Sequence, residues 1–303
     1  MKKSYMKYIL SLLLFGSNGI VASFIALTSY EIVLMRTMLG SLLLLMIFFL
    51  SRRKFTFMNH KKQFAALVLA GIALGASWLF LYEAYQQIGV SLSSLLYYCG
   101  PVIVMILSPL IFNEKLTMTK VGGFITVLIG IYLVNSKSSG SEANGWGLFC
   151  GGMSALMYAA MVIFNKKAKE IKGLENSMIQ LFISFMTAAV FIGIDHGFTI
   201  NIDTSNWLPI LFLGFINTGI GCYLYFSSIG HLPVHTVSIC GYLEPLSAVI
   251  FSAMFLNERL STVQVAGVIL ILGGAIFGEL FKGTFKNLII KNRLKYSKIF
   301  GTP

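Results

Sequence analysis

The chain alternates long apolar stretches with short polar connections. A hydrocarbon core about 30 Å thick requires about 20 mainly apolar residues in an α-helix, and ten stretches are of roughly this length. We expect each of them to be a transmembrane helix. They run near 8–28, 31–50, 64–87, 91–112, 118–135, 146–165, 177–194, 208–228, 234–256 and 262–281. None of the connections is long enough to hold a separate domain.

Composition supports a membrane protein and excludes several other classes. Hydrophobic residues make up 56% of the chain and charged residues 11%, whereas soluble domains carry about 25% charged residues. The net charge of +12 lies in short clusters between apolar stretches, which is not the continuous basic face of a nucleic-acid-binding protein. The four cysteines lack the spacing of a zinc site or a disulfide framework. We expect no cofactor and no metal.

The N-terminus resembles a signal peptide, because Lys2, Lys3 and Lys7 precede an apolar stretch that ends near a cleavage-like Val21-Ala22-Ser23. That stretch is long enough to span the membrane, however, and nine similar stretches follow it. We therefore expect an uncleaved first helix.

Basic residues predict the orientation, because Lys and Arg concentrate on the cytoplasmic side of membrane proteins. With the N-terminus inside, 20 of the 23 basic residues fall on the inner side. The outer side keeps only Lys137 and Arg259, and Arg36 lies within a span. We therefore expect a multi-pass plasma-membrane protein with both termini in the cytoplasm. The tail 282–303, which contains six basic residues and no acidic residue, is expected to be cytoplasmic.

The two halves of the chain share residues at fixed spacing. Pro101 precedes Glu114 by thirteen residues, and Pro245 precedes Glu258 by the same number. An offset of 144 then aligns a series of later residues, and an offset of 141 aligns earlier ones. The aligned pairs include Val121 with Val265, Gly123 with Gly267, Gly130 with Gly274, Tyr82 with Tyr223 and Ile88 with Ile229.

Each half contains five spans, an odd number, so the second half must enter the membrane with the opposite orientation. The sequence thus predicts an all-α membrane protein of ten transmembrane helices in two inverted five-helix repeats. We place the repeats at 1–139 and 140–281, followed by the tail. Inverted repeats are a recurrent transporter architecture, in which the two halves exchange conformations around a site between them.

The doubled element resembles the EamA family of the drug/metabolite transporter superfamily. It reads Asn-Glu-Lys-Leu-Thr at 113–117 and Asn-Glu-Arg-Leu-Ser at 257–261, each followed by Val-x-Gly and a glycine-rich last span. The segments 81–85 and 97–101 and the position of Arg36 also fit this family. The resemblance implies a ten-helix transporter that moves amino acids, amines, drugs or other metabolites, commonly outward. It leaves the substrate, the direction and the coupling ion open.

Glu83 is a first candidate for site chemistry, because charged side chains inside a span tend to line cavities. Trp78, Tyr82 and Tyr85 flank it on the third span, and the fourth span adds Tyr97 and Tyr98. An acid among aromatic faces suits an organic cation. Two other readings are a proton-binding group for coupling and a structural Glu that is hydrogen-bonded to Tyr or Ser between helices.

Glu244 and Arg36 are the other candidates. Glu244 precedes Pro245, which removes the helical hydrogen bond of the Gly241 carbonyl and favours a kink near the middle of the ninth span. A carboxylate beside a broken helix suits a coupling or substrate site, or a role in packing. Arg36 could bind a carboxylate or phosphate, or pair with Glu31 or a lipid headgroup. Glu83 aligns with Leu224 and Glu244 with Gly100, so neither acid is repeated.

These features predict a secondary transporter, not an enzyme, that exports a small metabolite by alternating access. The expected partners are a small-molecule substrate, the lipid bilayer and, as one option, a coupling proton, in a monomer or homodimer. A passive channel or facilitator for small polar solutes is the main alternative. A membrane enzyme or lipid-handling scaffold would need a cluster of catalytic groups at one depth, and the acids of this chain are scattered.

Overall fold

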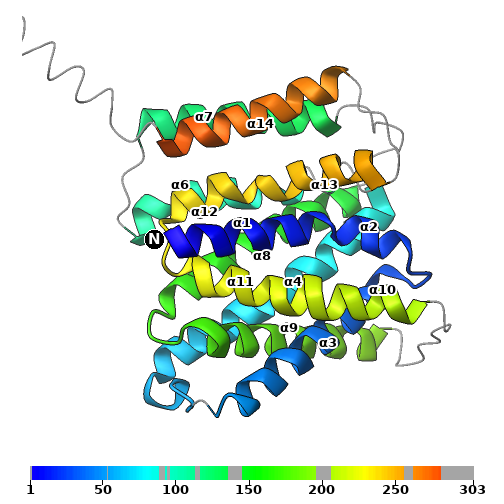
Figure 1. Ribbon diagram of the computed structural model, residues 1–303, viewed down its shortest axis with the longest axis vertical. Helices are drawn as coiled ribbons and strands as arrows, with labels where there is room; N and C mark the ends of the chain where they lie inside the picture. Colours follow the sequence, from blue (N-terminus) through cyan, green and yellow to red (C-terminus); the bar gives the residue numbers. More distant parts are fainter. Residues whose placement is uncertain are drawn as a thin grey trace, which may run out of the picture.

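The computed structural model describes residues 2–52, 54–88, 93, 96–112, 117–135, 145–195, 206–255 and 262–280. All regular elements in these residues are helical, and no β-strand occurs among them. Most helices run back and forth along one direction, so that the connections gather at two ends (Figure 1). The end that holds the N-terminus also holds the connections 168–172 and 230–233. We call it the N-terminal end.

The described helices follow the ten expected stretches in order. The first half contains α1 (Lys2–Gly16), α2 (Asn18–Ser23), α3 (Ser29–Leu50), η1 (Phe57–Asn59), α4 (Lys61–Ile88), α6 (Gly100–Phe112) and α7 (Met118–Asn135). The second half contains α8 (Gly145–Lys167), α9 (Gly173–Asp195), α10 (Trp207–Leu211), η3 (Phe212–Ile220), α11 (Gly221–Ile229), α12 (Val234–Gly241), α13 (Leu243–Phe255) and α14 (Thr262–Leu280).

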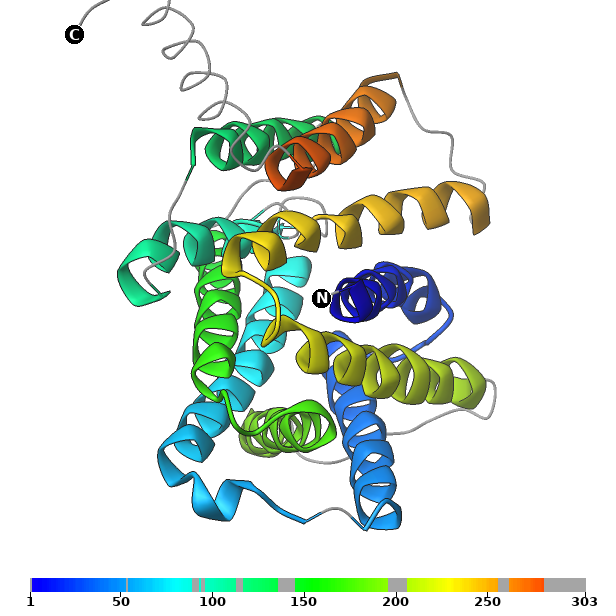
Figure 2. The same ribbon diagram turned by 60° about the vertical axis from the view of Figure 1, so that its left-hand side comes forward.

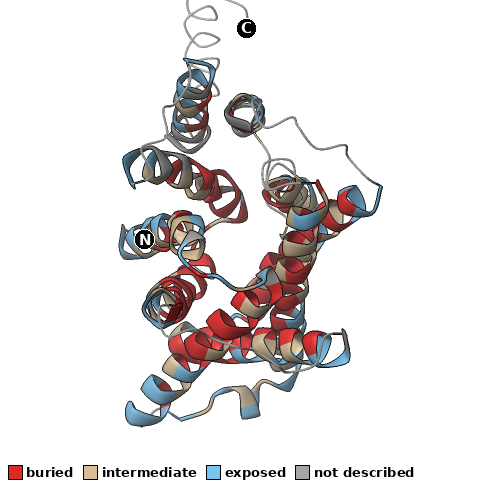
Figure 3. Ribbon diagram, turned by 90° about the vertical axis from the view of Figure 1, so that its right-hand side faces the viewer, coloured by how far each residue is buried: buried red, intermediate tan, exposed pale blue. Residues whose placement is uncertain are grey.

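The helices have the length and surface that a hydrocarbon solvent requires. Within the described residues, six helical stretches are long and apolar enough to cross a membrane, and three shorter apolar helices accompany them. Buried residues lie on the faces that meet inside the bundle (Figure 3). Large apolar side chains remain on the outside, and Leu110 and Ile194 are 80% and 83% exposed. Such a surface is stable in lipid and unfavourable in water.

Within the described residues, the first, eighth and ninth crossings are interrupted. The first breaks at Ser17, between α1 and α2, and the ninth breaks at Tyr242, between α12 and α13. The eighth contains η3, a nine-residue π-helix. Pro245 lies in the first turn of α13, where a missing N–H leaves no intrahelical bond unmade. The expected interruption near Pro245 is therefore present, and it lies three residues before the proline.

The two halves contact each other through equivalent residues. Helices α7 and α14, the last helix of each half, pack side by side at one edge of the bundle (Figures 1 and 2). A β-carbon at Gly130 would lie 2.7 Å from the backbone oxygen of Gly267, and one at Gly274 would lie 2.6 Å from that of Gly123. These four residues are the pairs that the offset of 144 aligns. We call this contact the glycine seam.

Other helix pairs also pack in equivalent ways in the two halves. Helix α1 packs on α13, and its counterpart α8 packs on α6; α3 packs directly on its own counterpart, α9. The rings of Tyr98 and Tyr242, also 144 residues apart, lie 6.5 Å from centroid to centroid. The Tyr242 hydroxyl donates to the Tyr98 carbonyl oxygen at 2.8 Å. The protein is thus an all-α membrane protein with ten transmembrane helices in two inverted five-helix repeats.

Several expectations concern residues outside the described ranges. These are the boundary between residues 139 and 140, the elements around Glu114 and Glu258, and the tail 282–303. They stay predictions.

The glycine seam predicts a position-specific effect on stability. Gly274→Ala places a methyl group against the backbone of α7, which is expected to lower the free energy of unfolding by about 1–3 kcal/mol. Gly273→Ala is a matched control on the next residue, because a β-carbon there meets no atom within 4 Å. Thermal unfolding in detergent should show a lower melting temperature for Gly274→Ala alone. Equal melting temperatures would contradict a close-packed seam.

Candidate functional site

A small cavity between the two halves brings together four of the predicted residues, Arg36, Trp78, Tyr97 and Glu244. We call it the central cavity. Its volume is about 40 Å³, room for about three water molecules. The remaining lining residues are Phe15, Asn18, Leu74, Tyr158, Met161, Cys222, Tyr225 and Phe226. Both halves therefore contribute walls, and the helices leave little space between them.

Arg36 projects from α3 and is held by two contacts. Its Nε donates to the Thr218 hydroxyl at 3.0 Å, and its guanidinium carbon lies 4.7 Å from the centre of the Trp78 ring. The side chain is only 4% exposed. Glu31, the alternative partner, instead accepts from Thr28 in a capping box at the start of α3. No ion pair joins Arg36 to another described residue, so its other N–H donors are available to a ligand.

Glu244 lies in the first turn of α13, next to the break at Tyr242. Its carboxylate is partly buried and forms no hydrogen bond or ion pair with a described residue. It lies close enough to Arg36 for the two charges to attract each other. Charged groups at this depth are costly unless they are paired or solvated in a cavity. Two opposite charges thus line one small cavity without a direct salt bridge.

Aromatic side chains form much of the remaining wall. The Tyr97 and Tyr158 rings meet edge-on at 5.4 Å, and the hydroxyls of Tyr158 and Tyr225 are 3.1 Å apart. Tyr225 in turn contacts Tyr8 and Phe15, at 5.4 and 5.8 Å between ring centroids. These rings offer an amphipathic surface to an apolar or cationic group.

The interrupted helices supply the polar part of the site. Thr218 belongs to the π-helix η3, and its hydroxyl also donates to Leu213 O, five residues earlier, at 2.8 Å. Asn217 donates to Leu14 O at 3.1 Å and to Asn18 Oδ1 at 3.0 Å, across the break in the first crossing. Irregular backbone at membrane depth is tolerated where it is packed inside protein or lines a cavity. All three interruptions lie beside this cavity.

Glu83 occupies a different place, at the other face of α4. It accepts hydrogen bonds from the Tyr30 hydroxyl, from Gln87 Nε2 at 3.0 Å and from Trp146 Nε1 at 3.1 Å. It lines a separate, mainly apolar cavity of about 510 Å³ with Tyr30, Phe191 and other residues. The structure therefore separates Glu83 from Trp78 and Tyr97, and its bonds correspond to the structural reading of this residue.

The other predicted aromatic residues lie near one site or the other. Tyr82 and Tyr85 contact each other, with ring centroids 5.3 Å apart, next to Glu83 in the sequence. Tyr98 contacts Tyr97 at 5.6 Å and Tyr242 on the second half. Tyr98 thus supports the wall of the central cavity.

Sequence reasoning missed the polar side chains Asn18, Asn217 and Thr218. A signal was present, because each interrupts an apolar stretch, and polar groups in a span tend to face the bundle interior. Nothing in the sequence indicated the π-helix that contains Thr218.

Comparison with known proteins gives a consistent result. A family model described as "EamA-like transporter family" matches residues 2–136 and, a second time, residues 145–278. The chain is 26% identical over 271 residues to "Uncharacterized transporter YxxF" of Bacillus subtilis, covering 88% of this chain and 86% of that one. It is 25% identical over 194 residues to "Probable amino-acid metabolite efflux pump" of Salmonella typhimurium, covering 60% and 65%.

The fold is also similar to a solved one. A known crystal structure superposes with a TM-score of 0.77, covering 91% of this chain and 98% of that chain at 16% identity. At this identity the match supports the fold alone.

The Arg36 contacts predict that Thr218 stabilises the site. Thr218→Val leaves the buried Nε without its acceptor, which is expected to lower the free energy of unfolding by about 1–3 kcal/mol. Thr126→Val is a suitable control, because the Thr126 hydroxyl bonds only within its own helix, to Gly122 O at 2.9 Å. Melting temperatures in detergent compare the two variants. An unchanged value for Thr218→Val would mean that Thr218 is dispensable for holding Arg36.

Proposed function

Because the chain belongs to the EamA-like transporter family, we propose that it exports a small zwitterionic metabolite of the amino-acid type. As a member of this family the protein is a membrane transporter of small solutes and not an enzyme. The observation that carries the proposal is the central cavity, where Arg36 and Glu244 present opposite charges without a direct salt bridge.

The geometry suits a zwitterion. The planar guanidinium of Arg36 matches a carboxylate, which it binds with two parallel hydrogen bonds. The Glu244 carboxylate matches an ammonium group. The apolar part of the solute would then pack against Trp78, Tyr97 and Tyr225. A purely cationic amine would satisfy Glu244 and leave Arg36 without an anion, and a purely anionic solute would do the reverse.

The small volume of the central cavity supports alternating access. A space of about 40 Å³ cannot hold an amino acid, so the helices must separate to admit one. Phe226 lies on the wall toward the N-terminal end, where it also lines a second cavity. By the offset of 141, Tyr85 is its equivalent in the first half, and we propose that it closes the path toward the opposite end.

Glu244 also supplies a route to coupling. A single carboxylate can bind either a proton or the ammonium group of the solute, so the proton and the solute compete for it. Because only one of them is bound at a time, the inward movement of a proton is coupled to the outward movement of the solute. We therefore propose proton-coupled export, with Glu244 as the shared group.

The charge pattern supports the proposed location and orientation in the membrane. The proposed plasma-membrane orientation, with both termini in the cytoplasm, rests on the concentration of Lys and Arg at one side. Under it, the N-terminal end of the bundle faces the cytoplasm. Export is supported by the efflux activity in the name of the Salmonella relative.

The zwitterion proposal predicts a selective thermal shift. Neutral amino acids should raise the melting temperature of the purified protein by mass action, and amines or carboxylates of similar size should raise it less. Arg36→Gln and Glu244→Gln should each weaken the effect by about tenfold or more. Glu83→Gln is the control and should keep it. If amines raise the melting temperature and only Glu83→Gln abolishes this effect, the substrate binds in the cavity beside Glu83 and not in the central cavity.

Coupling predicts accumulation in reconstituted vesicles. An imposed pH gradient should drive a labelled neutral amino acid above its equilibrium level, and Glu244→Gln should remove the dependence on the gradient. Equilibration without accumulation in the unaltered protein would identify a passive facilitator instead.

A further inference from the structure

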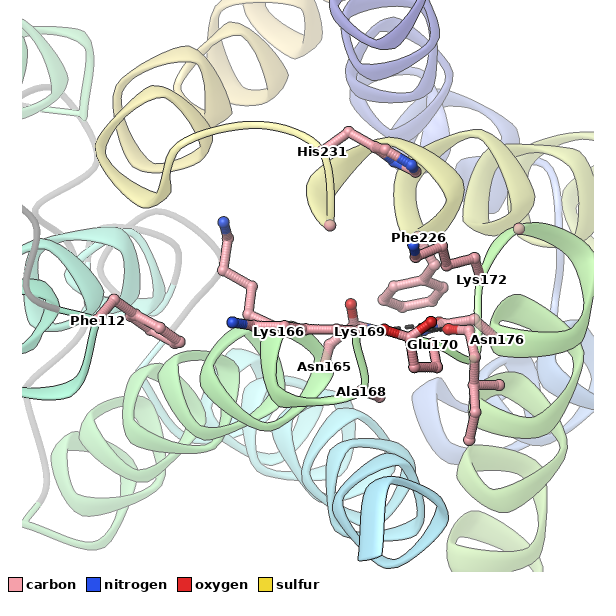
Figure 4. Close-up of a pocket in the computed structure, with 13 residues that line it drawn as sticks. Phe112, Asn165, Lys166, Ala168, Lys169, Glu170, Lys172, Asn176, Phe226 and His231 are labelled. Atoms are coloured by element: carbon pink, nitrogen blue, oxygen red, sulfur yellow. Dashed lines mark hydrogen bonds between the residues drawn. The ribbon is translucent and has the colours of Figure 1, made fainter. Parts of the chain in front are cut away.

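A second cavity of about 430 Å³ opens at the N-terminal end of the bundle. It lies between the end of α8, the turn that leads into α9, and the turn after α11 (Figure 4). We call it the basin. Its volume is within the range of small-molecule sites, about 300–1,000 Å³. The Phe226 side chain contributes to the wall of both the basin and the central cavity.

Basic side chains outnumber acidic ones in the described lining of the basin. Lys166, Lys169, Lys172 and His231 face it, and Glu170 is the acidic residue in its described lining. Lys166 is held in place, because it donates to Leu232 O and lies 5.9 Å from the centre of the Phe112 ring. Lys169 and Lys172 are exposed and form no hydrogen bond or ion pair with another described residue. The local charge is therefore positive.

The wall of the basin also contains buried amides with unmet hydrogen-bonding capacity. Asn165 and Asn176 line the basin and are 2% and 4% exposed. Asn165 Nδ2 donates to Asn176 Oδ1 at 2.9 Å, and also to Gln180. Asn165 Oδ1 nevertheless has no partner among the described residues. Buried polar groups without partners are rare and costly, so a ligand or water with a hydroxyl donor is expected beside this atom.

The N-terminus of α9 contributes a positive electrostatic potential that favours an anion in the basin. This helix of 23 residues begins at Gly173, which lines the basin, and the first N–H groups of a helix attract anions. The acid of its first turn, Glu175, is turned to other partners, since it accepts from Thr56 and from Phe57 N.

We propose that the basin binds an anionic group of the phosphate type, at a site distinct from the central cavity. A phosphate monoanion carries both oxygen acceptors for Lys169 and Lys172 and a hydroxyl donor for Asn165 Oδ1, so it matches the donors and the acceptor that the lining offers. A preference for Lys and Arg on the cytoplasmic side accounts for basic loops. It does not account for a cavity with buried amides in its wall. Under the proposed orientation, the source is a cytoplasmic phosphate compound or the headgroup of an inner-leaflet lipid.

Calorimetric titration of the purified protein with inorganic phosphate at constant ionic strength tests the proposal. Binding should be saturable. The double variant Lys169→Gln/Lys172→Gln should weaken it by about tenfold or more, and Glu170→Gln, which removes the opposing charge, should tighten it. Lys2→Gln/Lys3→Gln is the control, because these exposed lysines also belong to the N-terminal end but do not line the basin.

Equal phosphate affinity in all of these variants, or no saturable binding in the unaltered protein, would overturn the proposal. Nanodiscs distinguish the two sources. Phosphate affinity is measured in discs of phosphatidylcholine alone and in discs of phosphatidylcholine and phosphatidylglycerol in equal parts. Equal affinity in both indicates a soluble phosphate compound as the ligand. Weaker phosphate binding in the discs with phosphatidylglycerol indicates a lipid headgroup. Arg36→Gln should leave phosphate binding unchanged, so this result stands apart from the fate of the zwitterion proposal.

Discussion

The cost of holding charge inside a hydrocarbon layer is the constraint on which this structure depends. Arg36 and Glu244 are tolerated within the membrane because helices from both halves place them in a shared cavity. The hydrogen bond that holds Arg36 comes from irregular backbone, because Thr218 belongs to η3. The break in the first crossing places Asn18, which also lines the cavity, against Asn217. The departures from regular helix therefore concentrate where the charge is.

The symmetry of the bundle and the asymmetry of its site have separate physical origins. Equivalent contacts, such as those of the glycine seam and of Tyr98 with Tyr242, recur because a duplicated half must pack against itself. The charged residues do not recur, since Glu244 aligns with Gly100. A site on the axis between two halves can bind an asymmetric solute only if the halves differ there. Under the proposed alternating access, the shared scaffold would allow the exchange of conformations, and the unshared residues would select the ligand.

Much of the fold could be predicted from the sequence, because hydrophobic length and charge bias are direct consequences of the bilayer. The repeat offset aligned the four glycines of the seam as equivalent pairs, although it did not predict that they meet. The site was harder. Arg36, Trp78, Tyr97 and Glu244 were all expected from their residue types, but their grouping depends on helix rotation, which the apolar pattern of a lipid-exposed helix defines poorly. The sequence placed Glu83 among Trp78, Tyr82 and Tyr85, and the structure gives it Tyr30, Gln87 and Trp146 as hydrogen-bond partners.

The glycine seam has a mechanical consequence. It maps onto itself when the two halves are exchanged, because Gly130 meets Gly267 as Gly274 meets Gly123. Under the proposed alternating access, a contact with this property would keep the same geometry before and after the halves exchange conformations, so it would serve as the pivot of the bundle. The edge formed by α7 and α14 is therefore where a rigid fiducial for electron microscopy would be displaced least.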